Sequence, residues 1–447
     1  MNDNTTFQLE FAPIKNKKVT SCFDEPQVSS DGGVLFLREI DRQIGLTDRL
    51  VSAIDDKRRQ THIDHGLDEL LTQRIYQICC GYEDADDCDH LKGDPAFKIA
   101  VGRDPQEDPD LGSQPTMSRL ENSITARDLL RIGYALIDNF INSYPEPPKV
   151  IVLDMDPTAD EAHGRQEMIH FNGFEDCYCF MPFHVYEGIS GDLITTTLRP
   201  GKTPSYQEII AILKRIVRRI RAAWPKVEII FRADSHHTMP EVMKWMDKHT
   251  VDFCTGLRSN PRLYDLFAST IQDAERKYQV TGKPVRSITS AYYQAATWEK
   301  LQRVICRVKV SEKGTDVRCI VTSFQEAGAK YLYDTVYSGR GKMELMIKDH
   351  KMALKSDRTS CSKKEANQFR LFMHSAAYVL LHALRSNLLK GSEFATAQFD
   401  TIRLRLLKIG TRVEIGKRFL KLHFPMRYPL KPLLIQASSI LAVVNTT

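Results

Sequence analysis

Residues Tyr333–Lys351, with the sequence YDTVYSGRGKMELMIKDHK, place four functional groups along one side of a predicted helix. At about 3.6 residues per turn, the following side chains fall within about one quarter of the circumference: Tyr337, Arg340, Glu344 and Lys351. A carboxylate is a hard oxygen ligand for a metal ion, and guanidinium and ammonium groups bind phosphate. This face suits an enzyme that holds a phosphodiester beside a metal ion, although charges at this spacing also occur on ordinary surface helices.

The spacing Y-x2-R-x3-E-x6-K in this stretch resembles the signature of the DDE transposases of bacterial insertion sequences. In that family the glutamate of the signature is the third catalytic acid, so the resemblance implies this role for Glu344. It also implies DNA-binding roles for three further residues: Tyr337, Arg340 and Lys351. Two earlier aspartates should then lie at strand ends of an RNase H-like sheet.

The first of these aspartates is expected after the apolar run Val150–Leu153, which is typical of a strand buried on both faces. Asp154 and Asp156 follow it two residues apart and therefore point to the same side of the strand. A carboxylate at the end of a buried strand needs hydrogen bonds or a metal ion. Asp156-Pro-Thr158 resembles the family's D-x-T motif, which favours Asp156 as the first acid. Asp154 can reach the same site and remains a candidate.

The second aspartate is expected after Val227–Phe231, another short apolar run. Asp234 stands at its carboxyl end, where ligands collect in open α/β sheets. The string Arg232-Ala-Asp-Ser235 resembles the second-acid motif of the family. His236 and His237 lack the spacing of an imidazole metal site, so we expect them to support Asp234 rather than to bind metal.

Composition describes a large globular protein with little net charge. The chain has 447 residues, of which 42% are hydrophobic and 27% charged, which predicts two or more domains. A formal charge of +5 permits a polyanionic partner without arguing for one. No apolar run reaches the roughly 18 residues of a membrane span, and the N-terminus lacks an apolar signal segment. We therefore expect a cytoplasmic protein with no membrane partner, and ten cysteines without a CxxC pair are expected to be mostly buried thiols.

The predicted fold class is α/β: an RNase H-like mixed sheet with flanking helices, interrupted by a β-rich insertion and preceded by a helical N-terminal domain. The proline-rich segment Ser143–Pro148 marks the first boundary. The predicted parts are a helical N-terminal domain (1–145), the first part of the catalytic core (146–256), the insertion (257–335), the second part of the core with the signature helix (336–390), and a C-terminal β-hairpin and helix (391–447). The resemblance implies that the N-terminal domain binds DNA ends. A packing role is the equal alternative.

Periodicity locates further elements within these parts. Helices are expected at Leu67–Cys80, Ala126–Ile141, Tyr206–Trp224 and Lys363–Leu388. Strands are expected at Phe180–Tyr186, Asp192–Leu198, Tyr292–Thr297, Val304–Val310 and Val317–Phe324, and a hairpin at Thr401–Phe424.

The resemblance implies a transposase that cleaves the ends of an insertion sequence and transfers the strands. Asp156, Asp234 and Glu344 would bind two Mg²⁺ ions, for which Mn²⁺ can substitute. The implied partners are double-stranded DNA, as element ends and as target, and a second copy of the chain in a homodimeric synaptic complex. Two alternatives stay open: a metal-dependent nuclease on the same scaffold without strand transfer, and an inactive DNA-binding derivative. The presence of all three acids argues against the second.

Overall fold

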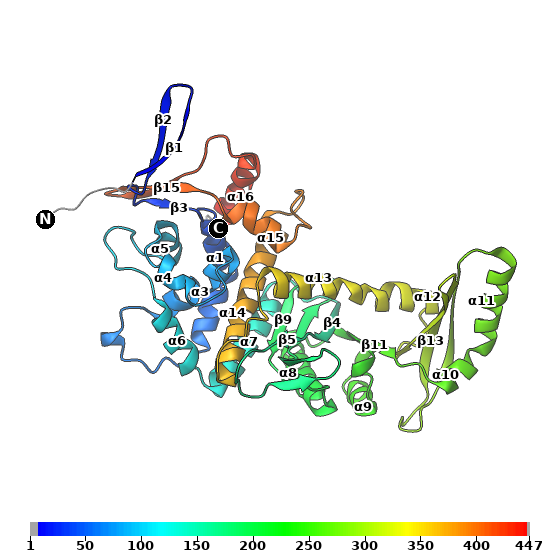
Figure 1. Ribbon diagram of the computed structural model, residues 1–447. Coiled ribbons are helices and arrows are strands. Elements are labelled where there is room, and N and C mark those ends of the chain that lie inside the picture. The colour runs from blue at the N-terminus through cyan, green and yellow to red at the C-terminus, as the bar shows by residue number, and fades with distance from the viewer. Residues whose placement is uncertain (1–7, 445–447) are drawn as a thin grey trace.

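A computed structural model describes residues 8–444 of the chain, and these form a mixed α/β protein built around one large sheet (Figure 1). The eight-stranded sheet has the order β12-β13-β14-β11-β10-β4-β8-β9. Its strands are β4 (Val150–Pro157), β8 (Phe183–Glu187), β9 (Leu193–Thr197), β10 (Glu228–Ala233), β11 (Val251–Leu257), β12 (Val285–Tyr293), β13 (Gln302–Ser311) and β14 (Gly314–Thr322). The α/β prediction is confirmed.

The strands at the centre of the sheet are parallel, and those at both sides are antiparallel. β10 lies between β4 and β11 and runs parallel to both. β8 and β9 continue the sheet from β4 as antiparallel strands, and β14, β13 and β12 continue it from β11 in the same way. The strands predicted around Val150–Leu153 and Val227–Phe231 are confirmed as β4 and β10. Short apolar segments are typical of strands in a sheet that is covered on both faces.

The two faces of the sheet differ in chemistry. In β4, Ile151, Leu153 and Met155 belong to an apolar core with α8 (Tyr206–Ala223) and α9 (Pro240–Lys248). The alternate residues Asp154 and Asp156 point to the opposite face. That polar face is crossed by the helical segment that carries the predicted signature (Figure 1).

Residues 34–142 are mostly helical, as predicted. The helices are α1 (Val34–Ile44), α2 (Leu46–Ser52), α3 (Leu67–Cys80), α4 (Asp87–Leu91), α5 (Pro95–Val101), α6 (Gln114–Ser123) and α7 (Ala126–Asn142), with a 3₁₀ turn at Gln60–His62. Their core includes α14 (Lys364–Ala383), a helix buried along nearly its whole length between them and the sheet (Figure 1). The N-terminal helices and this late helix therefore form one packed unit.

The C-terminal part adds short elements to that unit. A π-helical turn, η6 (Leu384–Leu388), follows α14, and α15 (Phe399–Ile402), a second π turn, η7 (Arg403–Leu407), and α16 (Lys431–Val444) come later. A hairpin forms within the predicted range Thr401–Phe424, from β15 (Thr411–Gly416) and β16 (Phe419–His423), with its turn after Gly416, and β15 also pairs with β3 (Val28–Ser29). The first part of that range is helical instead, because it belongs to α15 and η7. A further small sheet has the order β5-β7-β6 and comprises β5 (Asp160–Glu161), β6 (His170–Asn172) and β7 (Cys177–Phe180). Within residues 8–444, no helix is long and apolar enough to cross a membrane.

The insertion differs from the prediction in two respects. It contains two helices that the pattern did not indicate, α10 (Pro261–Leu266) and α11 (Ala268–Thr281), and its first strand lies at Val285–Tyr293 rather than at Tyr292–Thr297. Asn260 caps α10 by accepting a hydrogen bond from the Leu263 N–H, and Pro261 begins the helix. A capping Asn followed by Pro at the first helical position is a recognised signal for the start of a helix. The prediction missed it because it relied on the spacing of β-branched residues.

Replacing Asp128 with Ala should lower the free energy of unfolding by about 2 kcal/mol at pH 7. Asp128 lies in the first turn of α7 and accepts hydrogen bonds from Thr125, Arg131 and the Asp55 N–H. Burial raises the pKa of this carboxyl, but the hydrogen bonds outweigh burial and lower the pKa to about 2. Because the pKa in the unfolded chain is about 3.9, the stabilisation is present above pH 4 and is lost as pH falls toward 2.

Urea denaturation of both proteins at pH 7 and pH 3 checks this expectation. The difference between them should be about halved at pH 3, where roughly half of the linkage energy remains. Asp265→Ala, which removes an exposed carboxylate from α10, is the control and should have little effect at either pH. A constant difference at both pH values would contradict the ionic origin of the stabilisation.

Candidate active site

Two of the predicted acids lie side by side at the carboxyl ends of neighbouring parallel strands. In the ladder of β4 and β10, Asp154 is opposite Arg232. Two residues further along, Asp156 is the last but one residue of β4 and Asp234 follows directly after β10. Burial raises the pKa of Asp156, and the neighbouring charge of Asp234 raises it further. Parallel strands thus deliver both carboxylates to one edge of the sheet.

Asp154 forms a buried ion pair. Its two carboxylate oxygens accept hydrogen bonds from Nε and one Nη of Arg232, both at 2.6 Å, and its side chain has no exposed surface. Burial raises the pKa of Asp154, while Arg232 acts in the opposite direction. Arg232 also donates to the carbonyl oxygens of Val336 (2.7 Å) and Gly188 (3.3 Å). The pair therefore ties two strands to the signature segment.

Gly188 is required by this packing. A Cβ atom at that position would stand 2.2 Å from the Arg232 guanidinium and 2.4 Å from an Asp154 oxygen. Any side chain would push the two partners apart.

Asp156 is more accessible than Asp154, with 21% of its side chain exposed. One oxygen accepts a hydrogen bond from Arg340 Nη at 3.0 Å. Burial raises the pKa of Asp156 to about 6, with a further rise from Asp234 and an opposing effect of Arg340. A carboxylate with a raised pKa beside another carboxylate is a site where an added cation would be stabilising.

Asp234 is held by the two histidines that follow it. His237 Nδ1 lies 2.8 Å from one carboxylate oxygen and His236 Nδ1 lies 2.6 Å from the other. The His236 backbone N–H donates to the first oxygen at 2.9 Å. Burial raises the pKa of Asp234, but the histidines outweigh it and hold the pKa well below its usual range. Asp234 is therefore ionised at neutral pH, as expected for a residue that His236 and His237 support.

The signature residues lie on a continuous helical segment whose hydrogen bonding changes along its length. It comprises α12 (Ala329–Tyr331), a π turn η3 (Leu332–Tyr337), a 3₁₀ turn η4 (Ser338–Gly341), α13 (Lys342–Lys348) and a second π turn η5 (Asp349–Ala353). Turns of π type inside helices are frequent at functional sites. The departures from 3.6 residues per turn shift the four signature side chains from the single row that an ideal helix predicts.

Tyr337 and Arg340 reach the strand ends. The Arg340 guanidinium pairs with Asp156 and lies 5.9 Å from the centre of the Tyr337 ring. The Tyr337 hydroxyl would lie 3.0 Å from a Cβ atom added to Gly256 in β11, so this position needs a glycine. These two residues therefore face the same edge of the sheet as Asp156 and Asp234.

Glu344 and Lys351 have other surroundings. Glu344 is exposed on α13, one turn after Arg340, and residues 8–444 provide it with no hydrogen bond or ion pair. Lys351 donates to the Ala159 carbonyl oxygen and lies 3.9 Å from an oxygen of Asp160, which is fully buried. Over the described part of the chain, no three His, Cys, Asp or Glu side chains are arranged to hold a metal ion.

Asp160 and Arg232 are important residues that the sequence analysis did not single out. The position of Arg232 could have been predicted, because it precedes Asp234 by two residues and side chains two apart in a strand point to the same side. The role of Asp160 could not, because its partner Lys351 is remote in the sequence.

Replacing Lys351 with Met should lower the free energy of unfolding by about 3 kcal/mol, because it leaves the Asp160 carboxyl buried without a cation. The double variant Lys351→Met/Asp160→Leu should recover most of this loss. Urea denaturation measures all three proteins, with Lys348→Met, an exposed lysine of the same segment, as the control. If Lys351→Met were as stable as the control, Lys351 would be available to bind a phosphate.

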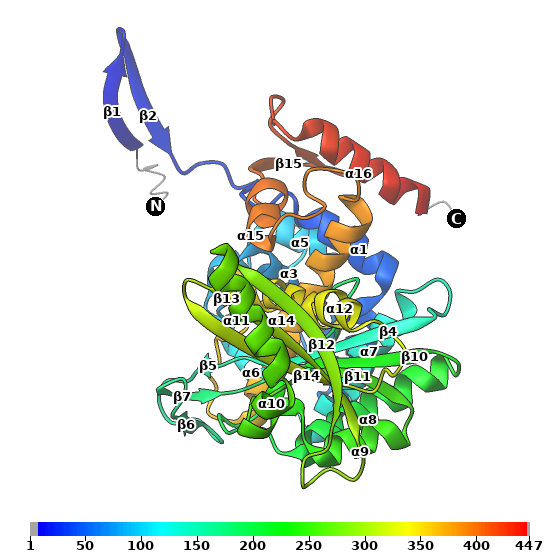
Figure 2. The same cartoon turned by 90° about the vertical axis from the view of Figure 1, so that its right-hand side faces the viewer.

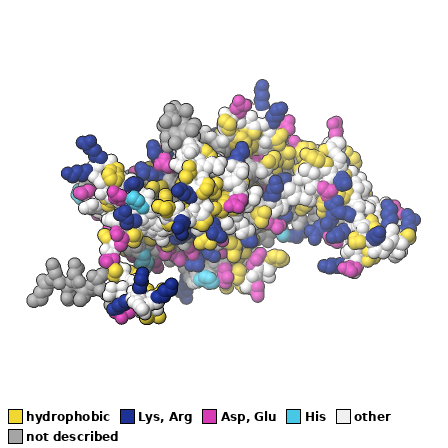
Figure 3. All heavy atoms as spheres, turned by 90° about the horizontal axis from the view of Figure 1, so that it is seen from above, with side chains coloured by type: hydrophobic (Ala, Val, Ile, Leu, Met, Phe, Trp, Pro, Cys, Tyr) yellow, Lys and Arg dark blue, Asp and Glu magenta, His cyan; other side chains and the backbone are white. Residues whose placement is uncertain are grey.

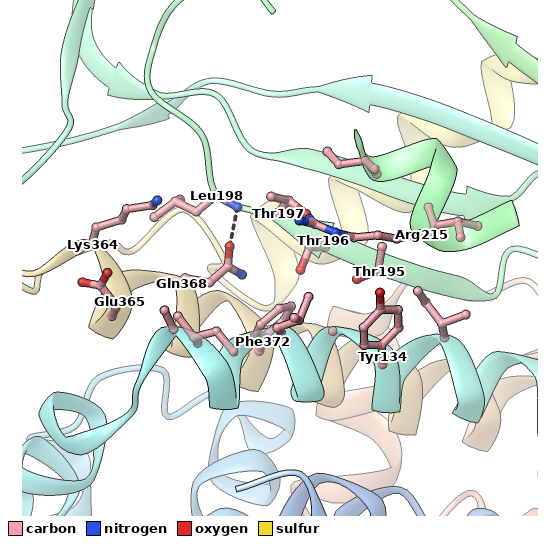
Figure 4. Close-up of a pocket in the computed structure, with 17 residues that line it drawn as sticks. Tyr134, Thr195, Thr196, Thr197, Leu198, Arg215, Lys364, Glu365, Gln368 and Phe372 are labelled. Atoms are coloured by element: carbon pink, nitrogen blue, oxygen red, sulfur yellow. Dashed lines mark hydrogen bonds between the residues drawn. The ribbon is translucent and has the colours of Figure 1, made fainter. Parts of the chain in front are cut away.

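An apolar pocket lies away from these acids. It has a volume of about 330 Å³ and lies between α7, α8, β9 and α14 (Figure 4). In Figure 4, Gln368 of α14 meets the end of β9, where its Oε1 accepts a hydrogen bond from the Leu198 N–H at 2.7 Å. The pocket contains none of the predicted site residues, so it gives no evidence on the reaction at the strand ends.

Residues 11–446 match the family model described as Transposase DDE domain group 1. A search of curated proteins finds no match. A cryo-EM structure of the piggyBac transposase synaptic complex with hairpin DNA aligns over 92% of this chain and 85% of that chain, with 13% identity and a TM-score of 0.43. That structural likeness is too weak for any inference to rest on it.

Proposed function

The chain belongs to the transposase DDE domain group 1 family, and from this premise we propose that it cleaves the ends of a bacterial insertion sequence and joins them to target DNA. The observation that carries the proposal is the edge of the sheet where Asp156 and Asp234 meet beneath Arg340 and Tyr337. Two carboxylates beside a guanidinium suit a phosphodiester whose negative charge must be held next to a bound cation.

We propose that the core is RNase H-like. The order β9-β8-β4-β10-β11 supports this, since three antiparallel strands are followed by two strands parallel to the first. The insertion then extends the same sheet through β14, β13 and β12. This arrangement brings the acid-bearing strands β4 and β10 together at its centre.

The donor set fits a hard divalent cation. Asp156 and Asp234, neighbours at the sheet edge, offer only oxygen atoms, which Mg²⁺ and Mn²⁺ prefer. Glu344, exposed on α13, would have to turn toward them to supply the third carboxylate. Burial and, to a smaller extent, repulsion from Asp234 raise the pKa of Asp156, and positive charge at this edge would offset both. When bound, two Mg²⁺ ions would lower the pKa of the attacking hydroxyl and stabilise the negative charge that develops on the leaving oxygen.

The chain's own residues would position the DNA. Arg340, now paired with Asp156, would bind a phosphate beside the acids, and Tyr337 would orient the strand next to it. His236 and His237 hold Asp234 in its ionised form. The contacts of Lys351 support a different role, which is to anchor the loop that follows Asp156 to the signature segment.

We propose Asp156 rather than Asp154 as the first acid. The side chain of Asp154 has no exposed surface and is held by the buried Arg232, so a metal ion bound to DNA does not reach it. Asp156 is partly exposed and stands beside Asp234.

We further propose that the enzyme acts as a homodimer on double-stranded DNA in the cytoplasm, with the N-terminal helices contributing to recognition of the ends. Two ends held together for joining require two active sites, which one copy of the chain does not contain. Mass measurement by light scattering with and without DNA ends tests this assembly.

The function is tested with a duplex that carries the sequences flanking the gene. With Mg²⁺, the wild-type protein should nick at the junction and, when supercoiled plasmid is added, produce joined molecules. Asp156→Asn should bind the duplex and produce neither, whereas Glu312→Gln, an exposed acid of the insertion, should behave as wild type. Nicking without joined molecules would favour the nuclease alternative, and binding without nicking by wild type would favour an inactive derivative.

A further inference from the structure

The N-terminal hairpin stands away from the rest of the protein. β1 (Gln8–Ile14) and β2 (Lys17–Cys22) pair only with each other in a two-stranded sheet. Figures 1 and 2 both show this hairpin projecting from the body, to which residues 23–27 connect it. Of its two strands, only Leu9 and Val19 are half-buried, and every other residue is exposed. We call residues 8–22 the arm.

The arm lacks the packing that normally stabilises a hairpin. A single two-stranded hairpin is marginally stable in water, and stability usually needs a third strand or a packed helix. Both edges of the arm also present unpaired backbone groups. Its apolar side chains Phe11 and Ile14 are 55% and 66% exposed. The arm therefore has the properties of an element that a partner completes.

The tip of the arm is positively charged. Lys15 lies in its turn, and Lys17 and Lys18 are the first residues of β2, whereas Glu10 is the only acidic residue of the arm and is paired with Lys18. Within the described part of the chain, Lys15 and Lys17 have no acidic partner. Figure 3, a view from above, shows dark blue side chains on the projecting hairpin. This positive charge favours a polyanion as the partner of the arm. A second copy of the arm is a poorer partner, because its lysines would repel the lysines of the first.

The dimensions of the arm match duplex DNA. The major groove of B-DNA is about 12 Å wide and admits a two-stranded β-ribbon. Seven residues of strand extend about 23 Å, enough to reach across the groove. Lysines at the tip would bind phosphates, and Phe11 offers an apolar contact for a thymine methyl group.

We propose that the arm inserts into the major groove of double-stranded DNA and binds its backbone through Lys15 and Lys17. The inference rests on the proposed function in that it takes DNA as the substrate, but it concerns binding and not cleavage. In Figure 1 the arm projects away from β4, the strand that carries Asp156, so it would bind DNA outside the site of cutting.

The test compares two double variants with the same loss of charge. Lys15→Gln/Lys17→Gln alters the arm, and Lys226→Gln/Lys248→Gln removes two exposed lysines that precede β10 and β11, at the edge of the sheet opposite the acids. The affinity for a duplex of the flanking sequence is measured from 50 to 200 mM salt. The slope of log K against log salt should fall by about 1.8 for the arm variant, from about 0.9 per phosphate contact, and should not change for the control.

Groove contact is tested separately by dimethyl sulfate protection of guanine N7, which faces the major groove. A chain that begins at residue 23 should lose one protected patch that wild type shows. Circular dichroism checks that this chain remains folded, as expected since the arm belongs to no hydrophobic core.

An unchanged salt slope in the arm variant would overturn the inference. So would a fall in mass by light scattering without a change in slope, because it would assign the arm to a second copy of the chain. If the slope falls but wild type never nicks DNA, the inference stands and the proposed function fails. If wild type nicks DNA and the slope does not change, only the inference fails.

Discussion

Glu344→Gln should lower the rate of cleavage at the element ends by about 1,000-fold or more, with DNA affinity close to that of wild type. A carboxylate that binds a catalytic metal contributes several kcal/mol to stabilising the transition state, and about 4 kcal/mol corresponds to that factor. Glutamine keeps the size of the side chain but lacks the charge that a hard cation requires. Glu344 is exposed and has no ion pair among the described residues, so the substitution should leave folding unchanged.

The measurement is single-turnover nicking in Mg²⁺ with protein in excess over DNA, accompanied by a binding assay in Ca²⁺. Glu241→Gln, which alters an exposed helical glutamate of α9, is the matched control and should cut at the wild-type rate. Equal rates for Glu344→Gln and the control would make Glu344 an ordinary surface residue. The assignment of the signature segment to the active site would then fail.

Asp154→Ala should destabilise the fold by about 3–5 kcal/mol, the usual cost of removing one partner of a buried ion pair. The variant leaves the guanidinium of Arg232 buried in the sheet, and it also loosens the link from β10 to the signature segment at Val336. The double variant Asp154→Leu/Arg232→Met should recover much of the loss, because apolar residues of similar size tolerate this environment.

Asp156→Asn is the comparison for this prediction, since it changes a partly exposed acid two residues away. Asp156→Asn should keep the wild-type stability in urea denaturation and lose cleavage. Asp154→Ala should lose stability, and the fraction of it that remains folded should still cleave DNA. If Asp154→Ala were as stable as wild type and inactive, Asp154 and not Asp156 would be the first acid.

The strands that carry the acids could be predicted from the sequence, because short stretches of mostly apolar residues indicate buried strands. Val150–Leu153 is apolar throughout, and Val227–Phe231 is apolar apart from the exposed Glu228. Short runs of this kind are typical of strands in a sheet that is covered on both faces. The pairing of Arg232 with Asp154 was not predicted, although the alternation of β10 places Arg232 on the same side as Asp234.

Other features depend on contacts that no local pattern contains. Lys351 fits the signature by spacing, yet in the structure it lies against Asp160, which is distant in the sequence. The π and 3₁₀ turns between Leu332 and Ala353 arise from packing of the segment on the sheet, and periodicity assumes a regular helix. The arm was missed because its residues are exposed, so its strands lack the apolar alternation that identifies a half-buried strand.

The position of α14 has a consequence for how the protein is made. The N-terminal helices emerge from the ribosome first, but the helix that completes their core begins only at Lys364. At 5–20 residues per second, α7 waits roughly 10–50 s before α14 is synthesised. During that time the apolar faces of α3 and α7 are open to chaperones and proteases, and any product that stops short of α14 retains them. Translation to beyond residue 383 is therefore a requirement for the first 142 residues to reach their folded state.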